Sequence, residues 1–275
     1  MPEMVEGEPA AEALAGALNR VALLVPHLTA RIDPADGDWM GGAALIDDPA
    51  WLGAVIRSTG PEIGTDDPVV AASVFVQGYS YRVLTLTVAC MTATGVVPDA
   101  SAPHLAVGLA KGWPSRVAFL DPAVVVVDGP DHVTVLRSEP DVAAATLRFI
   151  LERTVDEHLG PLIDAVRTGL GAAIGERLLW GNVAASAATA FRTMEGCLGA
   201  WIAPLGEQFF ALAPAPLQGL GSFLTVESNG RRGWFWERTN CCLIDRLPGG
   251  VRCADCSRTP TAQRRQGYEA SVDAS

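Results

Sequence analysis

The chain has 275 residues, of which 49% are hydrophobic and 19% are charged, so it can bury a sizeable core in one large domain or two modest ones. Its formal net charge of −11 argues against nucleic acid as the main partner, because phosphate binding needs a positive surface. The first ten residues lack the basic and apolar blocks of a signal peptide, and no uninterrupted apolar run reaches 18 residues. We therefore expect a cytoplasmic protein without an integral membrane segment.

The first third of the chain is predicted to be helical. Residues 11–30 have apolar side chains at helical spacing. Asp48-Pro49 and Asp67-Pro68 each place an N-cap aspartate directly before a proline at the first helical position. The second pair begins a long, mostly apolar helix that we expect to end near Gly95.

Short strands are predicted next, between about 104 and 137. The segments "HLAVGL", "RVAFL", "AVVVVDG" and "HVTVLR" are separated by Gly, Pro and Asp. From Asp141 the helical spacing returns and indicates an antiparallel helix pair, with a break near Gly169 to Gly171.

A β-hairpin is predicted near the C-terminus, where apolar residues alternate on both sides of Ser228-Asn229-Gly230. The fold class that we predict is α+β, mostly helical, with a small antiparallel sheet and a C-terminal metal module. We expect a helical α+β body over 1–220, with a subdivision near 100–140, and the hairpin with the metal module over 221–275.

Four of the six cysteines lie in "CCLIDRLPGGVRCADC", residues 241–256: Cys241, Cys242, Cys253 and Cys256. In a reducing compartment such a cluster is more often a metal site than a set of disulfides. The "PGG" between the two pairs can fold the chain back so that the pairs meet. Eight arginines and four acidic residues lie between positions 227 and 265, and this excess of positive charge would stabilise an anionic tetrathiolate centre.

Four thiolates suit either zinc or an iron–sulfur cluster. Structural zinc sites usually draw on two Cys-x2-4-Cys hairpins, and only the pair at 253 and 256 has that form. Adjacent residues in an extended chain point to opposite sides, so the pair at 241 and 242 would need a local turn to reach one small ion. The spacing thus weakens the zinc interpretation without excluding it.

The Cys-Cys-x10-Cys-x2-Cys spacing resembles the [2Fe–2S] signature of FhuF-like ferric siderophore reductases at all four positions. Upstream, Trp180, Gly181 and Asn182 in "LLWGNVAASAATAF" resemble a Trp-Gly-Asn element of the same family. The resemblance covers roughly 65–265. It implies that the four cysteines bind a [2Fe–2S] cluster and that the protein is an oxidoreductase.

The resemblance further implies one-electron reduction of a ferric siderophore, which releases iron as Fe(II). The hydroxamate type is one candidate substrate. No glycine fingerprint of a nicotinamide or flavin site follows a strand, since "GLGAAIG" at 169–175 follows a predicted helix. Electrons are therefore expected from an external one-electron donor, such as a ferredoxin or a flavoprotein.

The segment "RRGWFWER" supplies candidate substrate-binding residues: Arg231, Arg232, Trp234, Trp236 and Arg238. Their aromatic rings could contact a chelate and their guanidinium groups could bind its anionic groups. The competing interpretation is a strand with both tryptophans on the core face. Cys90 and Cys197 are expected to be packing residues, and His158 is expected on a helix surface or at a cap.

Two other functions are compatible with the sequence. One is an iron–sulfur electron-transfer partner without a siderophore site. A surface without a concave pocket beside the cluster would favour this function. The other is a zinc-stabilised binding protein. Colourless purified protein with stoichiometric zinc would favour this function.

Overall fold

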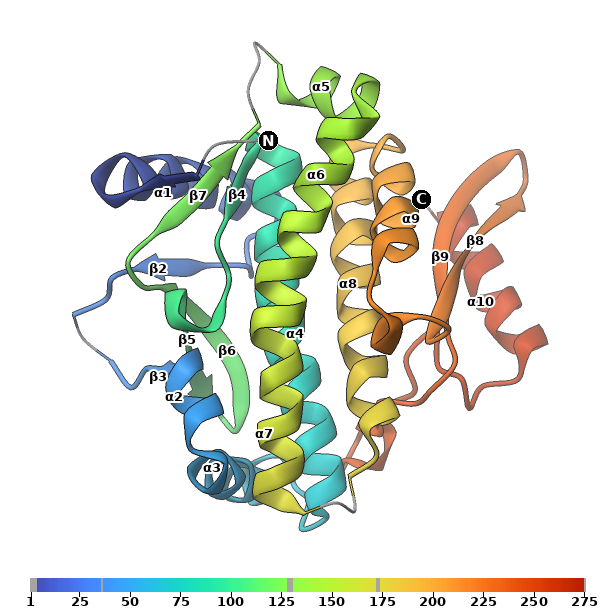
Figure 1. The fold of residues 1–275 in the computed structure, drawn as a ribbon. Helices are drawn as coiled ribbons and strands as arrows, with labels where there is room; N and C mark the ends of the chain where they lie inside the picture. The colour runs from blue at the N-terminus through green and yellow to red at the C-terminus, as the bar shows by residue number, and fades with distance from the viewer. Residues whose placement is uncertain (1–3, 36, 128–130, 172–173, 275) are drawn as a thin grey trace.

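The computed structural model describes residues 4–35, 37–127, 131–171 and 174–274. Its architecture is α+β and mostly helical, as predicted, with small and mostly antiparallel sheets (Figure 1). The longer helices are α1 (Gly7–Leu24), α3 (Pro49–Glu62), α4 (Pro68–Thr94), α6 (Pro140–Ile150), α7 (Gly160–Leu170), α8 (Glu176–Leu198), α9 (Ile202–Leu212) and α10 (Thr261–Ala274). The short ones are α2 (Gly42–Asp47) and α5 (His132–Ser138), with the π-helix η2 (Leu151–Leu159) and the 3₁₀ turns η1 (Ala102–His104), η3 (Ala215–Leu217) and η4 (Ile244–Arg246).

The strands form three sheets among the described residues. The first has the order β1-β7-β4, the second β2-β6-β5-β3, and the third is the hairpin β8-β9. Every pair is antiparallel except β2 with β6. The strands are β1 (Met4–Glu6), β2 (Ala30–Ile32), β3 (Met40–Gly41), β4 (Val96–Pro98), β5 (Leu105–Ala110), β6 (Trp113–Phe119), β7 (Ala123–Val126), β8 (Gly221–Ser228) and β9 (Arg231–Arg238).

Helix α4 is the central element of the core. The Asp67 side chain accepts a hydrogen bond from the Val69 amide at 2.9 Å, and the helix ends at Gly95 in the left-handed conformation, as predicted. Its length and composition would allow it to cross a membrane, but 72% of its most apolar window is buried inside the protein. A helix that is apolar on all sides must be surrounded by other parts of the protein. Helices α8, α1 and α3 and strand β6 pack against α4 in this way (Figure 1).

The predicted helix start at Asp48-Pro49 and the predicted break near Gly169 are also found, whereas the helix predicted over 11–30 ends at Leu24 and residue 30 begins β2. Asp48 Oδ1 accepts a hydrogen bond from the Trp51 amide at 2.9 Å and caps α3. Helix α7 ends at Leu170 and α8 begins at Glu176, so the predicted break is present, although residues 172 and 173 lie outside the described part. The main packing partner of α8 is α4 rather than α7.

One predicted strand is wrong. The segment "HVTVLR" alternates apolar and polar residues, yet it forms α5. The reason is a local cap: Asp131 accepts hydrogen bonds from the Val133 amide at 3.1 Å and from the Thr134 hydroxyl at 2.6 Å. This cap satisfies one backbone donor of the first helical turn, and it outweighs the strand preference of β-branched residues.

The predicted hairpin β8-β9 has its turn at Asn229 and Gly230, both with positive φ (48° and 76°), as a type I′ turn requires. Trp234 and Trp236 belong to the large core. Residues of the other face form a second, small core with α10: Val226, Phe235, Tyr268 and Val272. The hairpin is thus fixed between the body and the last helix (Figure 1), and the division at residue 220 stays a prediction.

The prediction for His158 is wrong, because its side chain is fully buried. Its Nδ1 lies 2.7 Å from the Ala100 carbonyl oxygen, which can only accept, so Nδ1 carries the hydrogen. Nε2 then accepts from the Tyr79 hydroxyl at 2.7 Å. Burial lowers the pKa of His158 to about 4, against the weaker opposing effects of the bond to Ala100 and the charge of Asp99.

This histidine predicts a loss of stability in acid. Below pH 6.5 the unfolded chain gains a proton that the folded chain does not accept until about pH 4, so the free energy of unfolding falls as pH falls through this window. The fall amounts to roughly 3 kcal/mol. Urea unfolding at several pH values should show it, and His158→Gln, although less stable at pH 7.5, should have a flatter pH dependence. Equal slopes for the two proteins would contradict the prediction.

Candidate metal centre

The four cysteines of the predicted motif lie in one loop between β9 and α10, here called the cluster loop (residues 241–256). The chain reverses at Gly249, which has φ 70°, and the Gly250 amide donates to the Leu247 carbonyl at 2.8 Å. The second pair then sits on a turn in which the Cys256 amide donates to the Cys253 carbonyl at 3.1 Å. The loop therefore brings the two cysteine pairs together.

The sulfur atoms form two close pairs, which we call crossed because each joins one of the two vicinal cysteines to one cysteine of the second sequence pair. Cys242 Sγ lies 3.6 Å from Cys253 Sγ, and Cys256 Sγ lies 3.9 Å from Cys241 Sγ. These separations are too long for disulfides, whose sulfurs are about 2.05 Å apart. They match the distance of about 3.8 Å between two sulfurs that bind one tetrahedral metal ion with 2.3 Å bonds.

The crossed pairs decide which metal group fits the donors better. Among the described residues, no three His, Cys, Asp or Glu side chains are gathered as they would be around one metal ion. A structural zinc site needs all four sulfurs around one ion, whereas a [2Fe–2S] cluster needs two sulfurs for each of two irons. Two separate sulfur pairs would therefore suit a two-iron cluster better than a single zinc ion, and the four cysteines are the residues that would hold it.

Burial and hydrogen bonds affect the pKa values of these cysteine thiols. Cys242 and Cys256 are buried, and Cys241 and Cys253 are partly exposed. The hydrogen bond between the Cys242 and Cys253 sulfurs lowers the pKa of Cys242 to about 6 and raises that of Cys253. Since the thiolate is the form that binds metals, the lowered pKa of Cys242 favours its role as a ligand.

The backbone turns at the residue that follows the vicinal cysteines. Leu243 adopts the left-handed conformation, with φ 65°, and its amide donates to Cys241 Sγ at 3.3 Å. This conformation is unfavourable for a branched side chain by roughly 1–2 kcal/mol. It aims a backbone donor at a sulfur, the kind of hydrogen bond that tunes an iron–sulfur cluster.

A chain of buried side chains connects the cluster loop to α4, α8 and β9. Arg238 Nη2 donates to Asn182 Oδ1 at 2.8 Å, and Asn182 Nδ2 donates to Ser73 Oγ at 2.8 Å. Ser73 Oγ in turn donates to the Cys242 carbonyl at 2.7 Å. We call Arg238, Asn182 and Ser73 the polar relay.

Arg238 also places a buried positive charge close to the sulfurs. Its charge acts to lower the pKa of both Cys242 and Cys253, and its Nε is buried without a hydrogen-bond partner among the described residues. A buried cation with a spare donor suits an anionic cluster. Of the arginines that we expected to stabilise an anionic centre, Arg238 is therefore the main candidate.

Two further arginines, one in the loop and one just after it, face a carboxylate that the sequence analysis did not single out. Asp245 Oδ2 lies 3.0 Å from Arg258 Nη1 and 3.4 Å from Arg252 Nε, and Asp245 Oδ1 lies 3.7 Å from Cys241 Sγ. The two guanidinium groups offset a negative charge that would otherwise repel an anionic cluster.

The Trp-Gly-Asn element on α8 has a structural explanation at this site. Asn182 is the middle member of the polar relay, and Gly181 gives room to Asn240, the residue before the vicinal cysteines. A Cβ at Gly181 would overlap the Asn240 side chain, whose Nδ2 donates to the Leu178 carbonyl at 3.2 Å. The helix and the start of the cluster loop can approach this closely only because residue 181 is glycine.

Gly181→Ala is therefore expected to destabilise the protein by about 1–3 kcal/mol, because the helix and the loop must separate. The matched control is Gly196→Ala on the same helix, where an added Cβ meets nothing within 4 Å. That variant should gain about 0.5–1 kcal/mol, as alanine normally does in a helix. Thermal unfolding of both variants checks the opposite signs, and equal effects would contradict the steric explanation.

The candidate substrate residues on β9 lie in three different environments. Trp234 and Trp236 are buried, stacked on Phe223 and Phe210 at ring-centroid distances of 3.8 and 4.5 Å. Arg238 is buried in the polar relay. This fits the competing interpretation of a core-facing strand for the tryptophans.

The other two arginines of this segment lie near the hairpin turn and are exposed. Arg231 Nη1 donates to the Asp273 carbonyl at 3.3 Å. Arg232 lies 3.6 Å from Glu227 and, with Trp234, Glu195 and Glu207, lines a cavity of about 330 Å³. A substrate role for these residues stays a prediction.

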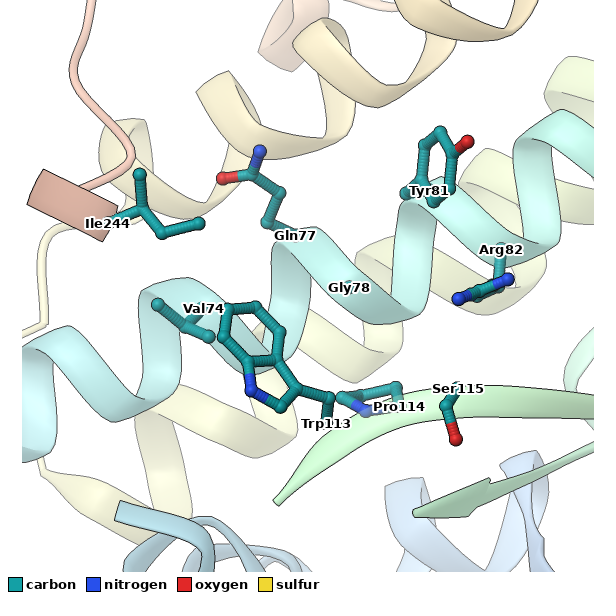
Figure 2. Close-up of a pocket in the computed structure, with 9 residues that line it drawn as sticks. All are labelled: Val74, Gln77, Gly78, Tyr81, Arg82, Trp113, Pro114, Ser115 and Ile244. Atoms are coloured by element: carbon teal, nitrogen blue, oxygen red, sulfur yellow. The ribbon is translucent and has the colours of Figure 1, made fainter. Parts of the chain in front are cut away.

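A pocket beside the cluster loop was missed by the sequence analysis. It has a volume of about 280 Å³ between α4, the start of β6 and η4. Figure 2 shows Ile244 of the cluster loop and Gln77 of α4 at one end, and Tyr81 and Arg82 further along the helix. A signal was available in the sequence: Gln77 carries the one amide side chain and Arg82 the one charge of this helix. Its lining residues are Val74, Gln77, Gly78, Tyr81, Arg82, Trp113, Pro114, Ser115 and Ile244.

Comparison with known proteins identifies two family models along the chain. Residues 73–231 match the model described as ferric iron reductase FhuF-like transporter, and residues 238–258 match the FhuF 2Fe-2S C-terminal domain. No curated protein matches the chain.

Two solved structures resemble the fold, both from a hypervirulent pathotype of Klebsiella pneumoniae. ATP-bound aerobactin synthetase IucA is 15% identical with a TM-score of 0.49, over 78% of this chain and 49% of that one. Aerobactin synthetase IucC is 18% identical with a TM-score of 0.43, over 66% of this chain and 32% of that one. The chain thus spans about half the length of the first and a third of the second.

Proposed function

Because the chain belongs to the FhuF-like ferric iron reductase family and carries its 2Fe-2S C-terminal domain, we propose that it reduces a ferric siderophore by one electron and so releases Fe(II). The four ligands that we propose for the [2Fe–2S] cluster are Cys241, Cys242, Cys253 and Cys256. The observation that carries the assignment is the crossed pairing of their sulfurs at 3.6 and 3.9 Å.

The chemistry requires little beyond an electron and a place for the chelate. Siderophore oxygens are hard ligands that hold Fe(III) far more tightly than Fe(II), so one electron weakens the complex. The bound cluster supplies one-electron transfer. The Fe(III) of the chelate gains the electron, and an external donor, a ferredoxin or a flavoprotein in the cytoplasm, restores the reduced protein.

The protein's own residues have supporting tasks in this proposal. Arg238 holds positive charge beside the sulfurs, and the polar relay fixes the Cys242 backbone against α4. Arg252 and Arg258 offset the charge of Asp245. Positive charge near the sulfurs favours the reduced, more negative state and so raises the potential.

The test begins with protein purified without oxygen. We expect visible absorption bands that bleach with dithionite and about two irons per chain. The pre-reduced protein is then mixed with a ferric trishydroxamate and an Fe(II)-specific trap, and we expect the bands to return as Fe(II) forms. Colourless protein with one zinc would overturn the proposal. Reoxidation by a small protein acceptor but by no ferric chelate would instead indicate an electron-transfer partner.

A further inference from the structure

We propose that the exposed tip of the cluster loop, residues 248–252, is the surface on which an acidic one-electron carrier protein docks, an inference that rests on the cluster of the proposed function. The loop tip lies beside a proposed cluster ligand. Val251 precedes Cys253 by two residues, so their Cα atoms are at most about 7 Å apart. Cys253 is itself partly exposed. A carrier that covers the loop tip would therefore lie next to the metal centre.

The loop tip projects from a base that is held against the body. Pro248 packs closely on Gly64 in the turn between α3 and α4, since its Cγ lies 2.8 Å from the place of a Cβ on that glycine. Arg246 Nη1 lies 3.6 Å from Asp67 Oδ2 at the start of α4. A Cβ at Gly249, by contrast, would meet nothing within 4 Å. Because the base is fixed, docking on the loop tip costs little conformational entropy.

The centre of the loop tip is apolar. Val251 is 78% exposed, whereas the other large hydrophobic residues exposed in the described part of the chain, Leu23 and Trp51, lie on α1 and α3. Single exposed apolar residues are common on protein surfaces and indicate no function by themselves. Val251 differs because it lies beside a cluster ligand and is flanked by positive side chains. An apolar centre with a polar rim is the usual anatomy of a protein–protein interface.

The rim of the loop tip is positive. The side chains of Arg246, Arg252 and Arg258 are 52, 47 and 45% exposed. Arg252 Nη1 donates to the Arg258 carbonyl at 3.3 Å, which keeps these two residues together. Both of their guanidinium groups share the single carboxylate of Asp245. That carboxylate can offset only one of the two positive charges, so the other is available to an acidic partner.

This end of the chain is the positive part of an acidic protein. Residues 227–265 contain eight arginines and four acidic residues, which gives +4, and the remainder therefore carries −15, since the total is −11. An oxidised [2Fe–2S] cluster with its four thiolates adds about −2, which leaves the segment positive. The asymmetry orients an acidic protein toward the cluster loop, whereas a basic protein would be drawn to the other faces.

Shape and redox chemistry narrow the partner further. Sites for small molecules are concave and enclose most of their ligand, whereas the loop tip projects, with open space around Gly249. A convex surface suits a protein partner, which supplies a larger contact area. The cluster exchanges single electrons. The partner is therefore an acidic carrier protein that delivers one electron at a time.

The experiment is calorimetric titration of the oxidised, cluster-containing protein with an oxidised plant-type [2Fe–2S] ferredoxin, a small acidic carrier, so that binding is measured without electron transfer. The chain offers a matched pair of variants, because Leu23 is 76% exposed and Val251 is 78% exposed. Val251→Glu should weaken binding at least about tenfold, since a like charge enters the centre of the interface. Leu23→Glu should leave the affinity unchanged.

Charge is tested in the same titration. Arg252→Gln should weaken binding, and more so at low salt than at high salt, whereas Arg148→Gln, an exposed residue of α6, should not. The affinity of the parent should fall as the salt concentration rises. Iron content and visible absorption of each variant show that the cluster is intact.

Three outcomes would overturn the docking surface: no binding of ferredoxin to the parent, equal affinities of Val251→Glu and Leu23→Glu, or an affinity of the parent that salt does not change. Reoxidation of the dithionite-reduced parent by a ferric trishydroxamate needs no carrier, so it tests the proposed function separately. If the chelate reoxidises the parent while Val251→Glu binds ferredoxin as the parent does, the function stands and the docking surface is wrong. If Val251→Glu binds weakly but no ferric chelate reoxidises the parent, the docking surface stands and the proposed function fails.

Discussion

Cys253→Ala is expected to abolish stable cluster binding, with iron falling from about two atoms per chain to less than about one-tenth of that. The change removes one ligand from one iron and leaves Cys242 without the partner whose sulfur lies 3.6 Å away. An iron held by a single protein sulfur has an open position that water or buffer thiols can enter. The variant should therefore be colourless or bleach within minutes in air, which absorption spectra and iron assays would show.

The chain contains a matched control for this experiment. Cys197 is exposed on α8, its Sγ donates weakly to the Leu24 carbonyl at 3.7 Å, and the prediction that it packs in the core is wrong. Cys90, by contrast, is buried in α4 as predicted. Cys197→Ala should keep full iron content and visible absorption. Full iron content in Cys253→Ala would show that the crossed pairing does not describe the ligands.

The sequence predicted the features that depend on neighbouring residues. Asp48 and Asp67 cap their helices within three residues, and the turn at Asn229 and Gly230 needs only its own positive φ angles. The spacing of the cysteines likewise belongs to one short loop. These signals are local, and no distant part of the chain can easily override them.

The parts that could not be predicted depend on contacts between distant segments. The polar relay joins positions 73, 182 and 238, and its two hydrogen-bonded side-chain pairs are 109 and 56 residues apart in sequence. Nothing in a single sequence shows that Ser73 lies under the cluster loop. Helix α10 was also missed, because it is polar apart from Tyr268 and Val272 and is fixed by packing on the hairpin.

Arg238→Gln is expected to lower the reduction potential of the cluster by on the order of 50–100 mV. Coulomb's law gives roughly 2 kcal/mol for a unit charge at about 8 Å and an effective dielectric constant of about 20, and about 1.4 kcal/mol corresponds to 59 mV for one electron. The sign follows from charge: reduction adds a negative charge, and the variant removes the buried cation that favours it. Redox titration followed by electron paramagnetic resonance measures the shift.

The same substitution should also destabilise the protein by about 1–3 kcal/mol, because Asn182 Oδ1 loses a charged donor at 2.8 Å. Two comparisons separate charge from structure. Arg238→Lys keeps the charge while losing the planar donor geometry, so its potential should lie closer to that of the parent. Arg265→Gln removes an equal charge from a side chain that is 71% exposed on α10, where solvent screens it. A potential unchanged in Arg238→Gln, or shifted equally in Arg265→Gln, would show that the buried guanidinium does not tune the centre.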